Sequence, residues 1–120
     1  MSLGKKSVAI VDDDEALLEA TSSFLESMGY HALPFQSGES FLDSPDGPAV
    51  GTLLTDINMP GMSGLELQQI VRARHPAIKI VMMTALKDES IRRRALAAGA
   101  RELLIKPVLA DDLIKCIEDA

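Results

Sequence analysis

The sequence predicts an α/β fold with a doubly wound, five-stranded parallel sheet and helices on both faces, and three observations support this prediction. Short aliphatic runs bounded by polar or turn residues recur along the chain, as expected of strands that are buried on both faces. Apolar residues three or four positions apart lie between these runs and are typical of helices that cover a sheet. Strand and helix alternate five times, which calls for right-handed crossovers between parallel strands.

Four aliphatic runs predict interior strands, at residues 7–11, 53–55, 78–83 and 103–105. A weaker run, residues 30–35, predicts one more strand, and Pro34 favours the edge of the sheet for it because proline cannot donate a ladder hydrogen bond. We expect the flavodoxin-like strand order 2-1-3-4-5, in which the first and third strands are neighbours.

Stripes of apolar residues predict the helices. The first helix is predicted from Leu17, Thr21, Phe24, Leu25 and Met28, the later ones from residues 67–71, 91–98 and 109–117, and a short helix from residues 37–43. Ser63 with Glu66 three positions later is a capping-box signature for a helix start. Gly29 and Gly99 stand where a residue with positive φ commonly ends a helix.

The remaining segments are predicted to be turns, loops and a leader. Residues 59–62 (MPGM) predict a turn, with Pro60 at its second position and Gly61 able to take the positive φ of its third. Residues 44–51 predict a surface loop. We expect residues 1–6 to be a flexible leader and residues 7–120 to form one domain, since a chain of 120 residues suits a single compact core.

The composition argues against several classes of protein. A formal net charge of −6 argues against direct wrapping of nucleic acid, so any DNA contact is expected to come from another domain. The single cysteine, Cys116, cannot form an internal disulfide. No apolar run approaches the length of a membrane span, and the first residues lack the apolar core of a signal peptide. We therefore expect a soluble cytoplasmic protein with no membrane contact.

Polar side chains follow the predicted interior strands. Asp12 and Asp13 come after the first strand, Asp56 after the third, Thr84 after the fourth and Lys106 after the fifth. Ligands of open α/β sheets bind outside the carboxyl ends of the strands, near the point where the strand order reverses. Three carboxylates in one crevice repel each other, so cations must offset them, and Lys106 and a divalent metal are the candidates.

The residue types at this edge favour phosphoryl chemistry. Carboxylate oxygens with no histidine or cysteine nearby favour magnesium, with manganese as the alternative, over zinc. A carboxylate such as Asp56 can attack phosphorus and form an aspartyl phosphate. A metal and Lys106 then neutralise the phosphoryl oxygens, and the Thr84 hydroxyl donates to one of them.

This constellation resembles the receiver domain of two-component response regulators, and the resemblance runs from about residue 5 to the end of the chain. It implies that Asp56 is the phosphoacceptor. It also implies that Asp13, Asp56 and the backbone carbonyl of Asn58 bind magnesium, while Asp12 helps through a water. The resemblance implies a signalling module rather than an enzyme, although one that promotes its own phosphorylation and dephosphorylation.

The same resemblance implies that Thr84 and Lys106 contact the phosphoryl group and that the Lys106–Pro107 peptide bond is cis. The phosphoryl group would come from a histidine kinase or a histidine phosphotransfer protein. It would switch the face made by the fourth helix, fifth strand and fifth helix, through which the family often dimerises. Residues 35–42 (FQSGESFL) and 59–68 (MPGMSGLELQ) look most like receivers fused to a C-terminal helix-turn-helix transcription domain. No such domain is among these 120 residues, so we expect either a truncated regulator or a receiver that works alone, and we favour truncation.

Two positions depart from the family pattern. Leu103 stands where the family usually has an aromatic ring that moves with the threonine, and Val108 stands where it often has phenylalanine. These departures concern transmission of the signal and not the phosphoryl chemistry. Asn58 and Leu86, two residues beyond Asp56 and Thr84, occupy positions that tune loss of the phosphoryl group in this family.

These residues also permit other interpretations. Asp14 and Glu15 are assigned to a helix N-terminus, where acidic residues suit the helix dipole. One alternative function is a phosphatase resembling the haloacid dehalogenase family. Asp12 and Asp14 have the spacing of that family's D-x-D motif, but Ala16 does not fit it. A further alternative is a degenerate receiver used only for protein contacts.

Overall fold

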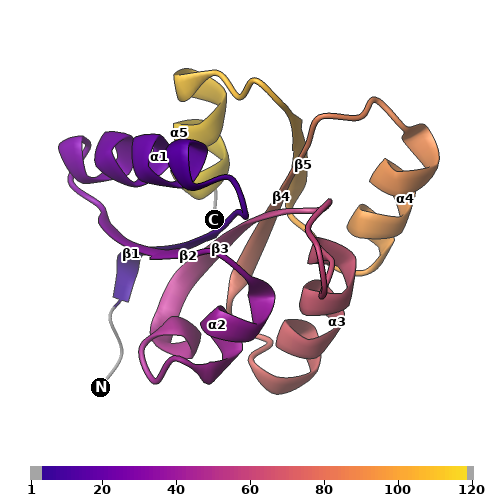
Figure 1. The fold of residues 1–120 in the computed structure, drawn as a ribbon, viewed down its shortest axis with the longest axis horizontal. Helices are drawn as coiled ribbons and strands as arrows, with labels where there is room; N and C mark the ends of the chain where they lie inside the picture. Colours follow the sequence, from indigo (N-terminus) through magenta and orange to yellow (C-terminus); the bar gives the residue numbers. More distant parts are fainter. Residues whose placement is uncertain (1–3, 119–120) are drawn as a thin grey trace.

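The computed structural model describes residues 4–118, which form one five-stranded parallel sheet in the order β2-β1-β3-β4-β5 (Figure 1). The strands are β1 Gly4–Val11, β2 His31–Phe35, β3 Val50–Asp56, β4 Lys79–Thr84 and β5 Glu102–Ile105. All four pairings are parallel, as the alternation of strands and helices requires. The predicted fold class and strand order are therefore confirmed, and β2, which contains Pro34, is an edge strand as predicted. The run at residues 103–105 was wrongly predicted as interior, because β5 pairs only with β4 and is the other edge strand of the described sheet.

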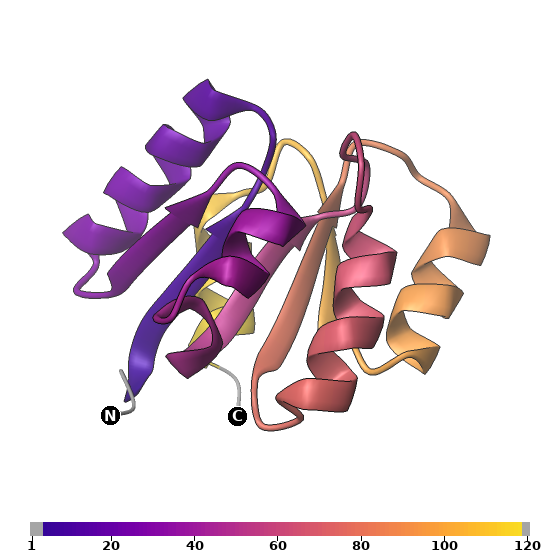
Figure 2. The same cartoon turned by 60° about the horizontal axis from the view of Figure 1, so that its bottom comes forward.

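The helices cover both faces of this sheet. They are α1 Glu15–Ser27, α2 Gly38–Asp43, α3 Gly64–Arg74, α4 Glu89–Ala97 and α5 Ala110–Glu118, with one 3-10 turn, η1 Gly47–Ala49. One face carries α1 and α5, and the opposite face carries α2, α3 and α4 (Figures 1 and 2). Each face has its own aliphatic core, with Leu25 and Leu113 in one and Leu67 and Val71 in the other. None of the helices in the described part of the chain combines the length and hydropathy needed to cross a bilayer.

Two predicted boundaries were wrong. β1 begins at Gly4, so residues 4–6 of the predicted leader belong to the sheet, and residues 1–3 lie outside the described part of the chain. β3 begins at Val50, so the predicted loop at 44–51 contains both η1 and the start of a strand. Gly51 weakens the strand signal in the sequence because glycine is depleted in strands, yet the next residue, Thr52, is buried and pairs with Val8 and Lys79 on its two sides.

The predicted stripe of α1 also differs from the face that is buried. Leu17 and Met28 are 43% and 50% exposed, whereas Leu18 and Leu25, seven positions apart, are 6% and 0% exposed. The sheet is covered by Leu18 and Leu25, while Leu17 lies on the side of α1 that lines a cavity with residues of α5. The apolar stripe is wide enough for either choice, and only packing against the sheet selects one of them.

The predicted turn and cap signals are confirmed. Ser63 and Glu66 form a complete capping box at the start of α3. Gly29, Gly61 and Gly99 all have positive φ, at 94°, 75° and 106°, so these loops turn where the sequence indicated. These local features determine where the chain leaves and enters the sheet, including at the carboxyl edge of the strands.

Candidate functional site

Four strands bring their polar residues to one edge of the sheet. Asp12 follows β1, Asp56 ends β3, Thr84 ends β4 and Lys106 follows β5. Val11 pairs with Thr55, Asp56 with Met83, and Thr84 with Ile105, so the four strands end at nearly the same level. The structure therefore brings together the side chains that the sequence predicted to share a crevice.

The carboxylates of Asp12, Asp13 and Asp56 form a compact cluster. One oxygen from each lies within 4.8 Å of the others, and Asp12 and Asp56 are buried while Asp13 is exposed at the mouth. Asp12 is oriented by the backbone N–H of Asp14, which donates to its Oδ1 at 3.0 Å. Two buried carboxylates so close together need nearby positive charge.

Lys106 supplies part of that charge. Its Nζ lies 3.0 Å from Oδ2 of Asp12 and 3.3 Å from Oδ2 of Asp56. Burial lowers the pKa of the Lys106 ammonium, but its hydrogen bond to Asp12 and the charges of Asp56 and Asp12 outweigh burial, so the pKa is raised overall. Lys106 therefore remains charged at neutral pH. The Lys106–Pro107 peptide bond is cis, as the resemblance implied.

The pKa of Asp56 is raised above that of an ordinary aspartate. Burial is the main cause, Lys106 opposes it, and the negative charge of Asp12 adds to it. The backbone N–H of Asn58 also donates to the Asp56 carboxylate and favours its charged form. Asp56 is thus a carboxylate whose ionisation costs the folded state free energy, as is typical of a functional site.

Thr84 is fully buried beside this cluster, and its hydroxyl oxygen accepts two hydrogen bonds. The donors are the backbone N–H of Leu86 at 3.1 Å and Nδ2 of Asn58 at 3.5 Å. Because both lone pairs of the oxygen are engaged, the Thr84 hydrogen is available to donate. For Asn58, the sequence predicted a backbone ligand and a position that tunes loss of the phosphoryl group. Its side-chain contact with Thr84 was missed, because no local pattern identifies the partner of an asparagine amide.

The peptide after Asp56 is held by two contacts that the sequence analysis also missed. Thr55 donates from Oγ1 to the carbonyl oxygen of Asp56 at 3.1 Å, and the N–H of Gly64 donates to the carbonyl of Ile57 at 2.9 Å. A Cβ built on Gly64 would overlap the carbonyl oxygen of Asp56. The glycine after the capping serine was the available signal, since glycine permits close approach of two backbone segments.

The acid cluster fits a small divalent cation. Three carboxylates face one ammonium, so a divalent ion would compensate the remaining negative charge. All donors in the cluster are hard oxygen atoms, which suit magnesium or manganese. The role of the Asn58 carbonyl as a further ligand stays a prediction.

Comparisons with known proteins agree with this geometry. The family model described as the response regulator receiver domain matches residues 8–118. The chain belongs to this family. It is 36% identical over 94% of its length to the response regulator protein TmoT of Ectopseudomonas mendocina, and 32% identical over 97% to the transcriptional regulatory protein FixJ of Bradyrhizobium diazoefficiens.

This receiver domain spans about half the length of those relatives, 51% of TmoT and 57% of FixJ. It also resembles the solved structure of response regulator StyR, with a TM-score of 0.83 and 38% identity over 93% of this chain and 57% of that one. TmoT and StyR are named as response regulators, and FixJ is named as a transcriptional regulatory protein.

Leu103 and Val108, the two residues that depart from the family pattern, both pack against the hydrophobic cores of this receiver domain. Leu103 is 4% exposed and belongs to the core under α3 and α4, together with Ala95. Val108 is partly buried against the core under α1 and α5. Leu86 is 51% exposed, beyond the buried Thr84. The core thus has an aliphatic side chain at the position where the family usually has an aromatic ring.

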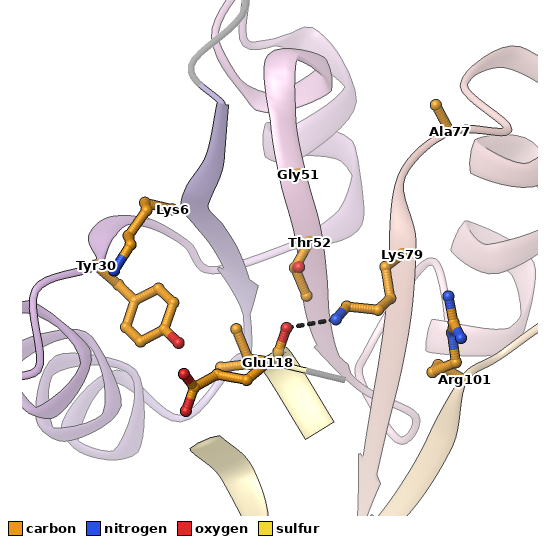
Figure 3. A pocket seen from close by; sticks show the side chains of 9 residues that line it. Lys6, Tyr30, Gly51, Thr52, Ala77, Lys79, Arg101 and Glu118 are labelled. Carbon is orange, nitrogen blue, oxygen red and sulfur yellow. Dashed lines mark hydrogen bonds between the residues drawn. The ribbon is translucent and has the colours of Figure 1, made fainter. Parts of the chain in front are cut away.

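A separate cavity of about 400 Å³ lies at the opposite, amino-terminal end of the strands (Figure 3). Its charged lining groups are engaged locally: the Nζ of Lys6 lies 5.6 Å from the centre of the Tyr30 ring, and Lys79 donates to the Ile117 carbonyl at the end of α5. Burial, together with the charge of Glu118, raises the pKa of Tyr30. The Lys79 hydrogen bond joins α5 to β4, and none of these contacts involves the acid cluster.

We expect Asp56→Asn to stabilise the fold by roughly 1 kcal/mol at neutral pH in EDTA, because it removes a buried charge that Lys106 only partly compensates. The raised pKa means that the folded state holds the proton more tightly than the unfolded state. The free energy of unfolding therefore falls as Asp56 ionises with rising pH, and the advantage of the variant should shrink at acidic pH. Urea unfolding over a pH series measures this difference.

The matched control is Asp46→Asn, which changes an exposed aspartate whose side chain makes no capping bond. Its free energy of unfolding should stay within about 0.5 kcal/mol of the wild type. A lower stability of Asp56→Asn than of the wild type at neutral pH would show that pairing with Lys106 outweighs the cost of burial.

We expect Gly64→Ala to cost about 1–3 kcal/mol in urea unfolding, because its Cβ displaces the Asp56 peptide or the start of α3. It should also slow phosphoryl labelling of the chain. Gly29→Ala is the control, since Gly29 has positive φ but open space around it. This control should lose about 1–2 kcal/mol and label at the wild-type rate. Equal labelling of both variants would contradict a positioning role for Gly64.

Proposed function

We propose that this receiver domain accepts a phosphoryl group on Asp56 from a histidine kinase or a histidine phosphotransfer protein. The observation that carries the proposal is the Lys106 ammonium, 3.0 Å from Asp12 and 3.3 Å from Asp56 within a cluster of three carboxylates. The buried Thr84 hydroxyl, tied to Asn58 next to Asp56, adds a donor at the same edge. Phosphoryl transfer to a carboxylate requires hydrogen-bond donors and positive charge nearby, because these groups stabilise the negative charge on the phosphoryl oxygens.

In the proposed step, a carboxylate oxygen of Asp56 attacks the phosphorus of the donor's phosphohistidine. The new oxygen–phosphorus bond forms as the phosphorus–nitrogen bond breaks, and the imidazole of the donor leaves with the electron pair. Lys106 and Thr84 stabilise the charge on the phosphoryl oxygens. Magnesium, or manganese in its place, supplies further positive charge when bound, and Asp12, Asp13, Asp56 and the Asn58 carbonyl would hold it.

The phosphorylated site would act on the surface made by α4, β5 and α5. Two apolar side chains on this surface are exposed, Ile105 at 36% and Leu109 at 68%, and they support contact with a second copy or with an output domain. Because the relative FixJ is named a transcriptional regulatory protein, we propose control of transcription through an output domain outside these 120 residues. DNA contact would come only from that domain.

The phosphatase alternative has less support from the structure. It needs Asp14 as an acid two residues after Asp12. The Asp14 carboxylate is the N-cap of α1, where it accepts from the backbone N–H of Leu17 at 3.1 Å. That contact matches the helix-capping role predicted for Asp14.

We expect the chain to take up one phosphoryl group when incubated with magnesium and acetyl phosphate, and Asp56→Asn to take up none. Lys106→Met should be labelled about a hundredfold more slowly, because it removes one preorganised cation from the transition state. Intact-mass analysis over time measures the label, and Asp46→Asn should match the wild type. Labelling of Asp56→Asn at the wild-type rate would refute the assignment of Asp56, and multiple-turnover hydrolysis of phosphomonoesters would favour the phosphatase.

An apolar cavity of about 470 Å³ adjoins the site and suits docking of the donor protein. Asp12 and Lys106 line one end of it, and the rest is lined by α1, α5 and the loop before α5, including Leu17, Phe24 and Val108. A phosphohistidine on another protein reaches Asp56 only if that protein covers this edge of the sheet. We propose that apolar side chains of the donor contact this cavity.

We expect Leu17→Glu to slow phosphotransfer from a purified histidine kinase about tenfold or more, since a charge replaces an apolar contact at the proposed interface. The kinase is one chosen from a panel because it phosphorylates the wild-type chain. Labelling by acetyl phosphate should be unchanged. Met28→Glu is the control, because Met28 is similarly exposed just beyond the far end of α1. Equal effects of the two variants on kinase transfer would contradict this docking surface.

A further inference from the structure

Gln68 is a fully buried amide between α3 and α4. Its Nε2 donates to the carbonyl oxygen of Ala95 in α4 at 2.8 Å. Its Oε1 is also buried, and it has no hydrogen-bond partner among the residues that the structure describes. Buried side-chain amides normally have both ends hydrogen-bonded, so an unpaired oxygen here calls for an explanation.

The contact holds the C-terminal end of α4. Ala95 is the buried residue of this helix, and its carbonyl also accepts from the N–H of Ala100 at 3.0 Å. The N–H of Gly99 donates to Leu96, which completes the helix end that a glycine with positive φ allows. Arg72, one turn after Gln68, lies against Gly99, because a Cβ built there would be 2.7 Å from its Nε. Two residues of α3 therefore contact the same end of α4.

In the described structure, the other end of α4 is held by weaker contacts: Ile91 is partly buried against the core, and the half-exposed guanidinium of Arg92 lies 3.4 Å from the Glu102 carboxylate of β5. Residues 85–90, which join Thr84 to the first turn of α4, are all exposed. The N-cap bonds of Asp88 are local, to the N–H groups of Ser90 and Ile91. A helix held more firmly at one end than at the other, with little buried surface, is the kind of element that moves at low cost in free energy.

The start of α3 contacts the phosphoacceptor. Gly64, its first residue, lies directly against the peptide that follows Asp56, and Gln68 is one turn further along the same helix. The helices α3 and α4 lie side by side in both views (Figures 1 and 2). A continuous path thus runs from the Asp56 peptide, through the rigid first turn of α3, to the last turn of α4.

We propose that Gln68 is the positioning residue through which α3 controls the position of α4 when Asp56 is phosphorylated. This inference rests on the proposed function of Asp56 and deepens it. The unpaired Oε1 makes the present arrangement costly, so a second arrangement in which α4 shifts and this oxygen gains a hydrogen bond is close in free energy. This coupling does not need an aromatic ring at position 103, where Leu103 packs in the same core as Ala95.

The test is hydrogen–deuterium exchange of the whole chain, with and without magnesium and beryllofluoride as an analogue of the phosphoryl group. In the wild type, we expect exchange of the amides of residues 89–97 to change about fivefold or more on binding. Gln68→Met has similar volume but neither amide group, and we expect the change in α4 to be lost. Binding of beryllofluoride, followed by ¹⁹F NMR, should persist in this variant.

Gln69→Met is the matched control, because Gln69 is the exposed neighbour on the same helix. It should respond like the wild type in both measurements. A merely structural role of Gln68 would change the stability of the chain and leave the response of α4 to beryllofluoride intact. That outcome, with Gln68→Met and Gln69→Met responding equally, would overturn the proposal.

Gln68→Leu serves as the second variant if Gln68→Met does not fold, and it should show the same loss. Failure of both variants to fold would overturn the proposal by showing that Gln68 is required for the fold itself. If beryllofluoride does not bind the wild type, the proposed function fails and this inference fails with it. If it binds and the response of α4 is absent in the wild type, or unaltered in Gln68→Met, only this inference fails.

Discussion

The site depends on one interaction, the contact of the Lys106 ammonium with two buried carboxylates. The strand order makes β1 and β3 neighbours, so Asp12 and Asp56 meet at the carboxyl edge of the sheet. Lys106 follows β5, beyond β4, and only a long side chain reaches both acids from there. Without this cation the burial of two carboxylates would be much more costly, so the fold and the chemistry of the site share the same ion pair.

The backbone around Asp56 is as constrained as its side chain. Thr55 and Gly64 hold the peptide on either side, and the α3 capping box at Ser63 determines where the helix begins. Asp56 therefore lies against the first turn of α3, while the end of the neighbouring α4 is joined to α3 through Gln68. The proposed coupling between the sheet edge and α4 would run through these packed groups, and packed interfaces tend to have two discrete arrangements rather than a continuous range of them.

Much of the fold could be predicted because its signals are local. The alternation of aliphatic runs with amphipathic stretches predicted the parallel sheet, and Pro34 predicted an edge strand. The errors came where local signals were weak or ambiguous. Gly51 was predicted as part of a loop but lies within β3, and α1 has an apolar stripe wide enough that Leu17 was expected to face the sheet in place of Leu18.

The sequence by itself determined which residues end the strands, where helices are capped and which side chains could meet at the sheet edge. Tertiary structure decided which groups actually touch. Lys106 and Asp12 are 94 residues apart in the chain, and Gln68 and Ala95 are 27 apart. Periodicity reports the face that each element buries, but a hydrogen-bond partner depends on how two elements pack, and no single segment of sequence contains that information.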